Sequence, residues 1–173
     1  EALMLAGART EAAALQPLIE EFVQRDIGRY ELPFCLHRCY AGMAATAAED
    51  WGTAESHFER ALRSVDHERP HRVDQARVRY WYARMLIETH ERVKDANPRA
   101  TVVGIGGDHS AHHLDKIEGM LQAGASNAMD ALSVHSYRYP ASPEATDLFG
   151  EILTVADLAR RYDATDRIWI TEI

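Results

Sequence analysis

The sequence predicts an α/β chain in two unlike segments: an all-α segment over residues 1–89, followed by alternating strands and helices over residues 90–173. Two patterns favour this division. Before residue 89, apolar residues recur every three or four positions, which is the period of an amphipathic helix. After Pro98, short apolar runs alternate with helical stretches, an order typical of a parallel sheet with crossover helices.

The first segment is expected to contain four helices separated by polar or glycine-containing breaks. Gly28 and Pro33 interrupt the first apolar stripe, and the turn at residues 50–53 separates the second stripe from the third, with Thr53 as the expected helix cap. Another break covers residues 66–70. The four stripes cover residues 11–23, 35–48, 54–65 and 73–87.

This helical series resembles the tetratricopeptide-like repeats of large bacterial transcriptional regulators. Four residues fit the repeat signature, namely Gly42, Ala54, Phe58 and Ala61, and four further signature positions hold Arg38, Ala41, Ala45 and Asp66 instead. Longer phrases at residues 57–62 and 76–86 support the same resemblance. The resemblance implies an interaction scaffold with a protein partner. A pair of ordinary helical hairpins is the alternative interpretation.

The second segment is expected to form three parallel strands joined by two helices. The expected strands cover residues 101–106, 131–135 and 168–171, and the expected helices cover residues 114–124 and 146–162. Trp169, inside the third strand, is expected to pack in the core. Polar residues follow the strands, at Asp108 and His109, at His135 and Tyr137, and at Glu172. In β/α barrels, reactive residues occupy these carboxyl ends.

Three motifs in this segment resemble consecutive landmarks of the clan A retaining glycoside hydrolases, which include xylosidase- and cellulase-like families. They are Asn-Pro-Arg-Ala-Thr-Val-Val-Gly at 97–104, Asp-Ala-Leu-Ser-Val-His-Ser-Tyr at 130–137 and Ile-Trp-Ile-Thr-Glu at 168–172. They are similar to strands five, six and seven of that eight-stranded barrel. The resemblance covers residues 90–173 and implies a partial (β/α)-barrel with three parallel strands.

The resemblance also implies roles for individual residues in O-glycosyl hydrolysis. Glu172 matches the catalytic nucleophile, and His135 and Tyr137 match residues that line the sugar-binding cleft. Asp108 and His109, in the loop after the first strand, are compatible with sugar contact. A retaining mechanism needs two carboxyl groups about 5 Å apart, a nucleophile and an acid/base. The alternative for Glu172 is a surface carboxylate without a catalytic role.

One departure from the family pattern bears directly on activity. The family carries its acid/base glutamate after strand four, usually next to an asparagine, whereas this sequence has no Asn-Glu pair and has the helical segment at the corresponding place. Acid assistance typically contributes about 10²–10⁴-fold to the rate. We therefore expect a glycoside hydrolase segment that is inactive alone. The alternative function is a non-catalytic, tetratricopeptide-like interaction or regulatory module.

Composition argues against several other classes of function. The formal charge of −8 disfavours binding to the phosphate backbone of nucleic acids, and no apolar run is long enough to span a membrane. No cofactor and no metal is expected. The histidines and aspartates near residues 108–115 are interpreted as a solvated loop, with metal binding as the alternative. Cys35 and Cys39 are interpreted as packed small residues, with a redox or metal role as the alternative.

Overall fold

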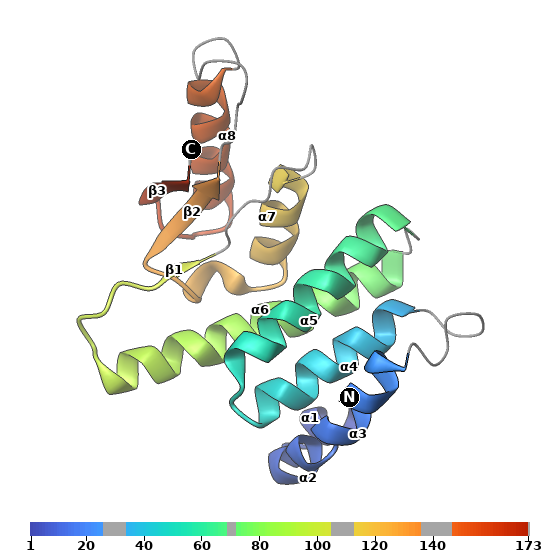
Figure 1. Ribbon diagram of the computed structural model, residues 1–173. Helices are drawn as coiled ribbons and strands as arrows, with labels where there is room; N and C mark the ends of the chain where they lie inside the picture. Colours follow the sequence, from blue (N-terminus) through green and yellow to red (C-terminus); the bar gives the residue numbers. More distant parts are fainter. Residues whose placement is uncertain (26–33, 69–71, 105–112, 136–146, 173) are drawn as a thin grey trace. The chain divides into compact units, whose positions relative to one another are not determined.

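The computed structural model describes residues 1–25, 34–68, 72–104, 113–135 and 147–172 (Figure 1). The chain forms two compact units, Glu1–Met85 and Leu86–Ile173, which we call the helical unit and the α/β unit. The division between them lies at residues 85 and 86, whereas the sequence places it at residues 89 and 90. The mixed α/β class expected from the sequence is confirmed.

The helical unit is built from successive short and medium helices. The expected helix over residues 11–23 is in fact two helices that meet at Leu15, so that prediction was wrong. Pro17 lies in the first turn of the second of these helices, where its missing N–H leaves no helical hydrogen bond unmade. The elements are α1 (Ala2–Leu5), α2 (Arg9–Ala14), α3 (Gln16–Gln24), α4 (Phe34–Ala47), α5 (Trp51–Arg63), a π-helical turn (Ser64–Glu68) and the first part of α6 (Arg72–Ala96).

The core of the helical unit lies where α4 packs against α5 (Figure 1). Gly42 allows this close approach, because a Cβ atom added there would lie 2.8 Å from the Phe58 ring. Phe58 is fully buried and stacks on Tyr82 of α6, with ring centroids 5.6 Å apart. Asp50, rather than Thr53, caps α5, since its carboxylate accepts a hydrogen bond from the Thr53 backbone N–H at 3.3 Å.

The α/β unit contains a three-stranded parallel sheet in the order β1-β2-β3. The first strand is shorter than the sequence predicts within the described residues, and the second has the predicted bounds. After the last part of α6, the elements are β1 (Val103–Gly104), α7 (His113–Gln122), a 3₁₀ turn (Ala125–Asn127), β2 (Ala131–His135), α8 (Leu148–Arg161) and β3 (Ile168–Glu172).

Helices α7 and α8 lie on the same face of the sheet, because they contact one another directly. The Tyr162 hydroxyl at the end of α8 donates to Glu118 of α7 at 3.0 Å and accepts from Gln122 at 2.8 Å. The sheet and these helices share a core of fully buried apolar residues, which includes Ile117, Met120, Leu132, Val134 and Val155. This arrangement is what two βαβ units with crossover helices produce.

Trp169 does not pack fully in the core, so the expectation for this residue was wrong. Its side chain is 42% exposed, and that of its neighbour Ile170 is 40% exposed. Successive residues of a strand point to opposite faces of the sheet, so β3 exposes apolar surface on both faces. Among the described residues, no helix is long and apolar enough to cross a membrane.

Candidate functional site

The carboxyl ends of β2 and β3 bring two of the sequence-predicted site residues together. His135 ends β2, Glu172 ends β3, and the two are register partners across the parallel pair. Backbones of paired strands lie about 4.8 Å apart, so these residues are direct neighbours in the sheet. The description of Glu172 extends to its backbone and not to its side chain, whereas the His135 side chain is half-buried.

A local irregularity separates these two residues from the regular part of the sheet. Val134 pairs with Ile170, but His135 pairs with Glu172, so Thr171 is an additional residue on β3. Such bulges redirect the side chains that follow them and are common beside functional sites. The irregularity therefore marks the point where regular pairing of β2 and β3 ends, directly before His135 and Glu172.

A buried hydroxyl pair joins the two strands next to this irregularity. Ser133 Oγ on β2 lies 2.6 Å from Thr171 Oγ1 on β3, and Ser133 is almost fully buried. A buried hydrogen bond adds modestly to the free energy of unfolding, whereas a buried hydroxyl left without a partner lowers it by more. The pair adds a side-chain hydrogen bond between β2 and β3 directly before His135 and Glu172.

The remaining site residues expected from the sequence lie outside the described residues. These are Asp108 and His109 in the loop after β1, and Tyr137 in the loop after β2. The sheet order β1-β2-β3 brings the carboxyl ends of the strands before these loops to one edge. Of the five predicted residues, the described structure thus brings together His135 and the backbone of Glu172.

A charged cluster at the opposite end of β2 was not identified as a site from the sequence. Asp130, directly before β2, accepts from Lys94 Nζ at 2.6 Å and from the Val102 backbone N–H at 2.8 Å. His90 Nε2 lies 3.9 Å from the other carboxylate oxygen. Hydrogen bonding to Lys94, then to Val102, lowers the pKa of Asp130.

The contacts of this cluster hold backbone segments of the α/β unit together. The Lys94 ammonium also donates to the Ala100 carbonyl at 2.6 Å, and the Asp130 carbonyl accepts from Thr165 at 2.9 Å. These contacts join the end of α6 to the segments before β1, β2 and β3. In β/α folds, the amino ends of strands carry stability while the carboxyl ends carry chemistry. The sequence offers one signal for this cluster, the spacing of His90 and Lys94, which places both on one side of a helix. That spacing does not indicate that Asp130 is their partner.

The described residues do not offer a metal site, since no three side chains from histidine, cysteine, aspartate or glutamate come together there. The cluster for which metal binding was the alternative interpretation, at residues 108–115, is mostly outside the described part of the chain. Cys39 is fully buried on α4. The side chain of Cys35 is outside the description.

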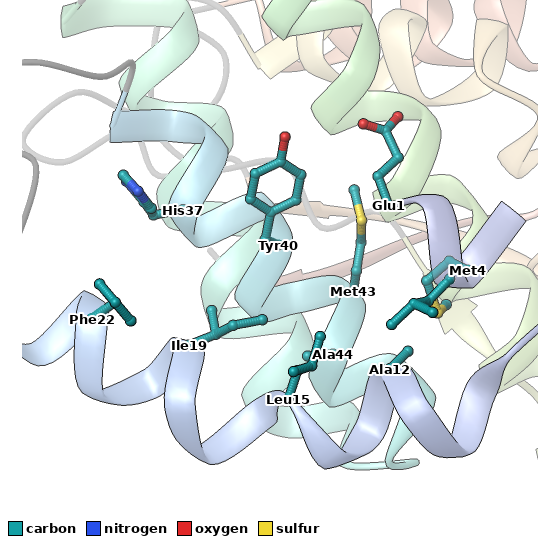
Figure 2. A pocket seen from close by; sticks show the side chains of 11 residues that line it. Glu1, Met4, Ala12, Leu15, Ile19, Phe22, His37, Tyr40, Met43 and Ala44 are labelled. Atoms are coloured by element: carbon teal, nitrogen blue, oxygen red, sulfur yellow. The ribbon is translucent and has the colours of Figure 1, made fainter.

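The helical unit contains an apolar groove of about 410 Å³, shown in Figure 2. One wall comes from the α2–α3 region and the other from α4. Leu15, Ile19 and Phe22 form the first wall, and Tyr40 and Met43 belong to the second. Leu15 and Phe22 are about two-fifths exposed, so the groove is open to solvent. The sequence showed these residues as apolar stripes but did not indicate that two stripes would leave a groove between them.

Comparison of the chain with protein-family models, with curated proteins and with solved structures found no match. The resemblances to glycoside hydrolases and to tetratricopeptide-like repeats therefore remain proposals.

Proposed function

We propose that the α/β unit is a segment of a clan A retaining glycoside hydrolase in which Glu172 occupies the nucleophile position. The observation that carries this proposal is the position of Glu172 at the carboxyl end of a parallel strand, with His135 as its register partner. The unbroken order of strand, helix, strand, helix and strand supports it further. A strand end holds a nucleophile more rigidly than a loop would.

In the proposed reaction, a Glu172 carboxylate oxygen attacks the anomeric carbon while the bond from that carbon to the leaving oxygen breaks. His135, on the neighbouring strand, would contact the sugar. The leaving oxygen needs a proton from a second carboxylic acid. Asp130 does not meet this need, because it lies at the other end of β2 and is bound to Lys94. We therefore expect no turnover of unactivated glycosides by this chain.

A substrate whose leaving group needs no protonation tests the nucleophile independently of the missing acid. Dinitrophenyl 2-deoxy-2-fluoro-glycosides of glucose and xylose release dinitrophenolate without acid assistance, and the fluorine slows hydrolysis of the glycosyl-enzyme ester. We expect slow release of one equivalent of dinitrophenolate per chain. Peptide mass spectrometry should locate the added sugar on Glu172, and Glu172→Gln should abolish labelling.

The control for this experiment is Glu151→Gln, which removes a carboxylate of α8 remote in sequence from any predicted site residue. Labelling should be unaffected in that variant. Labelling on another residue, or no labelling after prolonged incubation at millimolar reagent, contradicts the assignment of Glu172. Turnover of an unactivated disaccharide that is lost in Glu172→Gln would instead overturn the expected inactivity.

The apolar groove favours a second candidate function, a protein-interaction module in the helical unit. Its walls expose Leu15 and Phe22 beside the buried Met43. A groove of this kind fits the apolar face of an amphipathic peptide helix, which presents side chains at i, i+3 and i+4. The ligand in this second proposal is therefore a peptide rather than a sugar.

Selection from a random displayed peptide library tests this second candidate. Enriched peptides should carry apolar residues at helical spacing, and Leu15→Lys with Phe22→Lys should weaken their binding by about tenfold or more. Val73→Lys is the matched control, because Val73 is an exposed apolar residue that does not line the groove. Enrichment that is equal for the groove variant and the unaltered chain contradicts the proposal.

A further inference from the structure

Helix α3 does not turn its most apolar flank toward the rest of the helical unit. No residue of α3 is buried. Its most covered stripe is made of half-buried residues, namely Gln16, Ile19, Glu20 and Val23. Leu15, Leu18 and Phe22 form the apolar flank and are 41%, 52% and 40% exposed. At 3.6 residues per turn, this flank lies roughly 100° around the helix axis from the covered stripe.

Polar contacts between α3 and α5 account for this rotation of α3. An amphipathic helix ordinarily turns its apolar stripe inward, but here the covered stripe contains two polar residues. Glu20 Oε1 lies 2.6 Å from His57 Nε2, and Gln16 donates to Asp50, the N-cap of α5, at 3.4 Å. The first contact is the more enclosed, since the side chains of His57 and Glu20 are 9% and 24% exposed.

The His57 ring depends on Glu20 for its hydrogen bonding. An ionised carboxylate can only accept hydrogen bonds, so the Nε2–H group of His57 is the donor. The other ring nitrogen, Nδ1, is buried and has no hydrogen-bond partner among the described residues. A rotation of α3 that withdraws Glu20 leaves the buried ring without any hydrogen bond, which is costly. The pair therefore opposes such a rotation.

We propose that the Glu20–His57 pair is the positioning contact of the apolar groove, because it holds α3 in the rotation that leaves the groove open. Leu15 and Phe22 of the apolar flank line the groove, whereas Glu20 and His57 do not, so the pair acts through the position of α3 (Figure 2). Without the pair, α3 turns about its axis and places its apolar flank against α4, which narrows the groove. This role rests on the second candidate function for its peptide ligand, but not for the rotation of α3.

Titration of the full chain with the fluorescent dye anilinonaphthalene sulfonate, which binds exposed apolar surface, tests this role. The unaltered chain should bind the dye, and Leu15→Lys with Phe22→Lys should lose this binding. Glu20→Ala should weaken it by about tenfold, because the apparent affinity falls with the fraction of molecules whose groove is open. Glu21→Ala is the matched control and should bind like the unaltered chain, since Glu21 pairs with Arg25 of its own turn of chain.

Two substitutions of His57 distinguish the hydrogen bond from the presence of a histidine. In His57→Gln the side-chain amide still offers an N–H donor to Glu20, so dye binding should be nearly unchanged. His57→Leu fills much of the same space without a donor and should weaken dye binding as Glu20→Ala does. If circular dichroism shows that His57→Leu does not fold, the comparison of Glu20→Ala with Glu21→Ala decides, because it leaves the buried ring in place.

Hydrogen exchange of the same chains distinguishes rotation of α3 from its unfolding. Backbone amides of residues 16–24 should stay nearly as protected in Glu20→Ala as in the unaltered chain, because a helix that turns about its axis keeps its own hydrogen bonds.

Several results overturn the positioning role. They are equal dye binding by Glu20→Ala and Glu21→Ala, loss of protection in α3, a His57→Gln chain whose dye binding is as weak as that of Glu20→Ala, and an unaltered chain that binds no dye. If the dye results are as expected but no peptide is selected, the peptide-binding function is overturned and the role of the pair stands.

Discussion

Lys94 Nζ lies 2.6 Å from Asp130 Oδ2, and this ion pair joins the carboxyl end of α6 to the residue directly before β2. The same carboxylate accepts the Val102 backbone N–H directly before β1. One side chain therefore fixes three segments of the α/β unit. Removing its charge takes the anionic partner from the partly buried Lys94 ammonium and weakens the acceptor of the Val102 N–H, which costs more than the loss of a surface ion pair.

We predict that Asp130→Asn lowers the stability of the α/β unit in a pH-dependent way. The pKa of Asp130 is lowered in the folded state by its hydrogen bonds to Lys94 and Val102. A depressed carboxyl pKa contributes stability that is present above the unfolded value of about 3.9 and is lost as pH falls through the folded value. Asp130→Asn should therefore melt at a lower temperature than the unaltered chain near neutral pH. The two melting temperatures should converge as the pH falls below about 4.

Asp157→Asn is the matched control for this prediction. Asp157 also pairs with a cation, Arg160 at 2.9 Å, but both side chains are about two-thirds exposed. Exposed pairs typically contribute between about 0 and 1 kcal/mol, so its melting curves should nearly overlie those of the unaltered chain. If Asp130→Asn behaves like Asp157→Asn at every pH, the ion pair of Asp130 does not stabilise the fold.

Two glycines on adjacent helices should respond to alanine in opposite directions. At Gly42 an added Cβ would lie 2.8 Å from the Phe58 ring, so Gly42→Ala should destabilise the helical unit by about 1–3 kcal/mol. At Gly52, in the first turn of α5, nothing lies within 4 Å, and Gly52→Ala should stabilise by up to about 1 kcal/mol. Urea denaturation measures both changes.

A second substitution distinguishes the close contact from a general helix effect. Phe58→Leu makes room beside residue 42, so Gly42→Ala should cost less in that background than in the unaltered chain. A double-mutant cycle measures this difference. If the two substitutions are additive, the Gly42–Phe58 contact does not limit the packing of α4 on α5.

The sequence predicted elements well where a single local signal decides them. β2 has its predicted bounds because the run at residues 131–135 is short and its first four residues are buried on both faces. The helix expected over residues 11–23 was wrong, because apolar periodicity continues through Leu15 although the backbone turns there and begins α3 anew. Trp169 was misjudged for a different reason. Its exposure depends on which other elements cover β3, and this is not a property of its own segment.

The candidate site shows the same difference between local and long-range information. His135 and Glu172 were identifiable because each follows an apolar run, and strand ends gather at one edge of a parallel sheet. The contact between Lys94 and Asp130 was not predictable in this way, since the two residues are 36 positions apart and the sequence around each does not indicate the other as its partner. The groove in the helical unit depends on how α3 packs against α4, and the spacing of apolar residues along each helix does not determine that packing.

Tyr82→Phe should destabilise the helical unit modestly at neutral pH and change its behaviour in alkali. The Tyr82 hydroxyl donates to Glu59 at 3.2 Å, so its loss should cost about 1 kcal/mol. Burial, together with the nearby Glu59 and Glu55 carboxylates, raises the pKa of Tyr82 well above its ordinary value of 10.0. A raised phenol pKa gives stability that is full below about pH 10 and declines above it. Above about pH 10, the stability of Tyr82→Phe should therefore decline less steeply with pH than that of the unaltered chain. Circular dichroism measures both declines, and equal declines contradict this prediction.

The Ser133–Thr171 hydroxyl pair offers a test of how β2 holds β3 in register. The two oxygens lie 2.6 Å apart and Ser133 is almost fully buried, so Ser133→Ala and Thr171→Val should each lower the free energy of unfolding by about 1 kcal/mol. The double variant should lose less than the sum, with a coupling energy of about 0.5–1.5 kcal/mol. Thr154→Val is the control, because among the described residues its hydroxyl donates to the Gly150 carbonyl of the same helix at 2.8 Å, so it should not couple to Ser133. A coupling near zero between Ser133 and Thr171 means that backbone pairing alone sets the register.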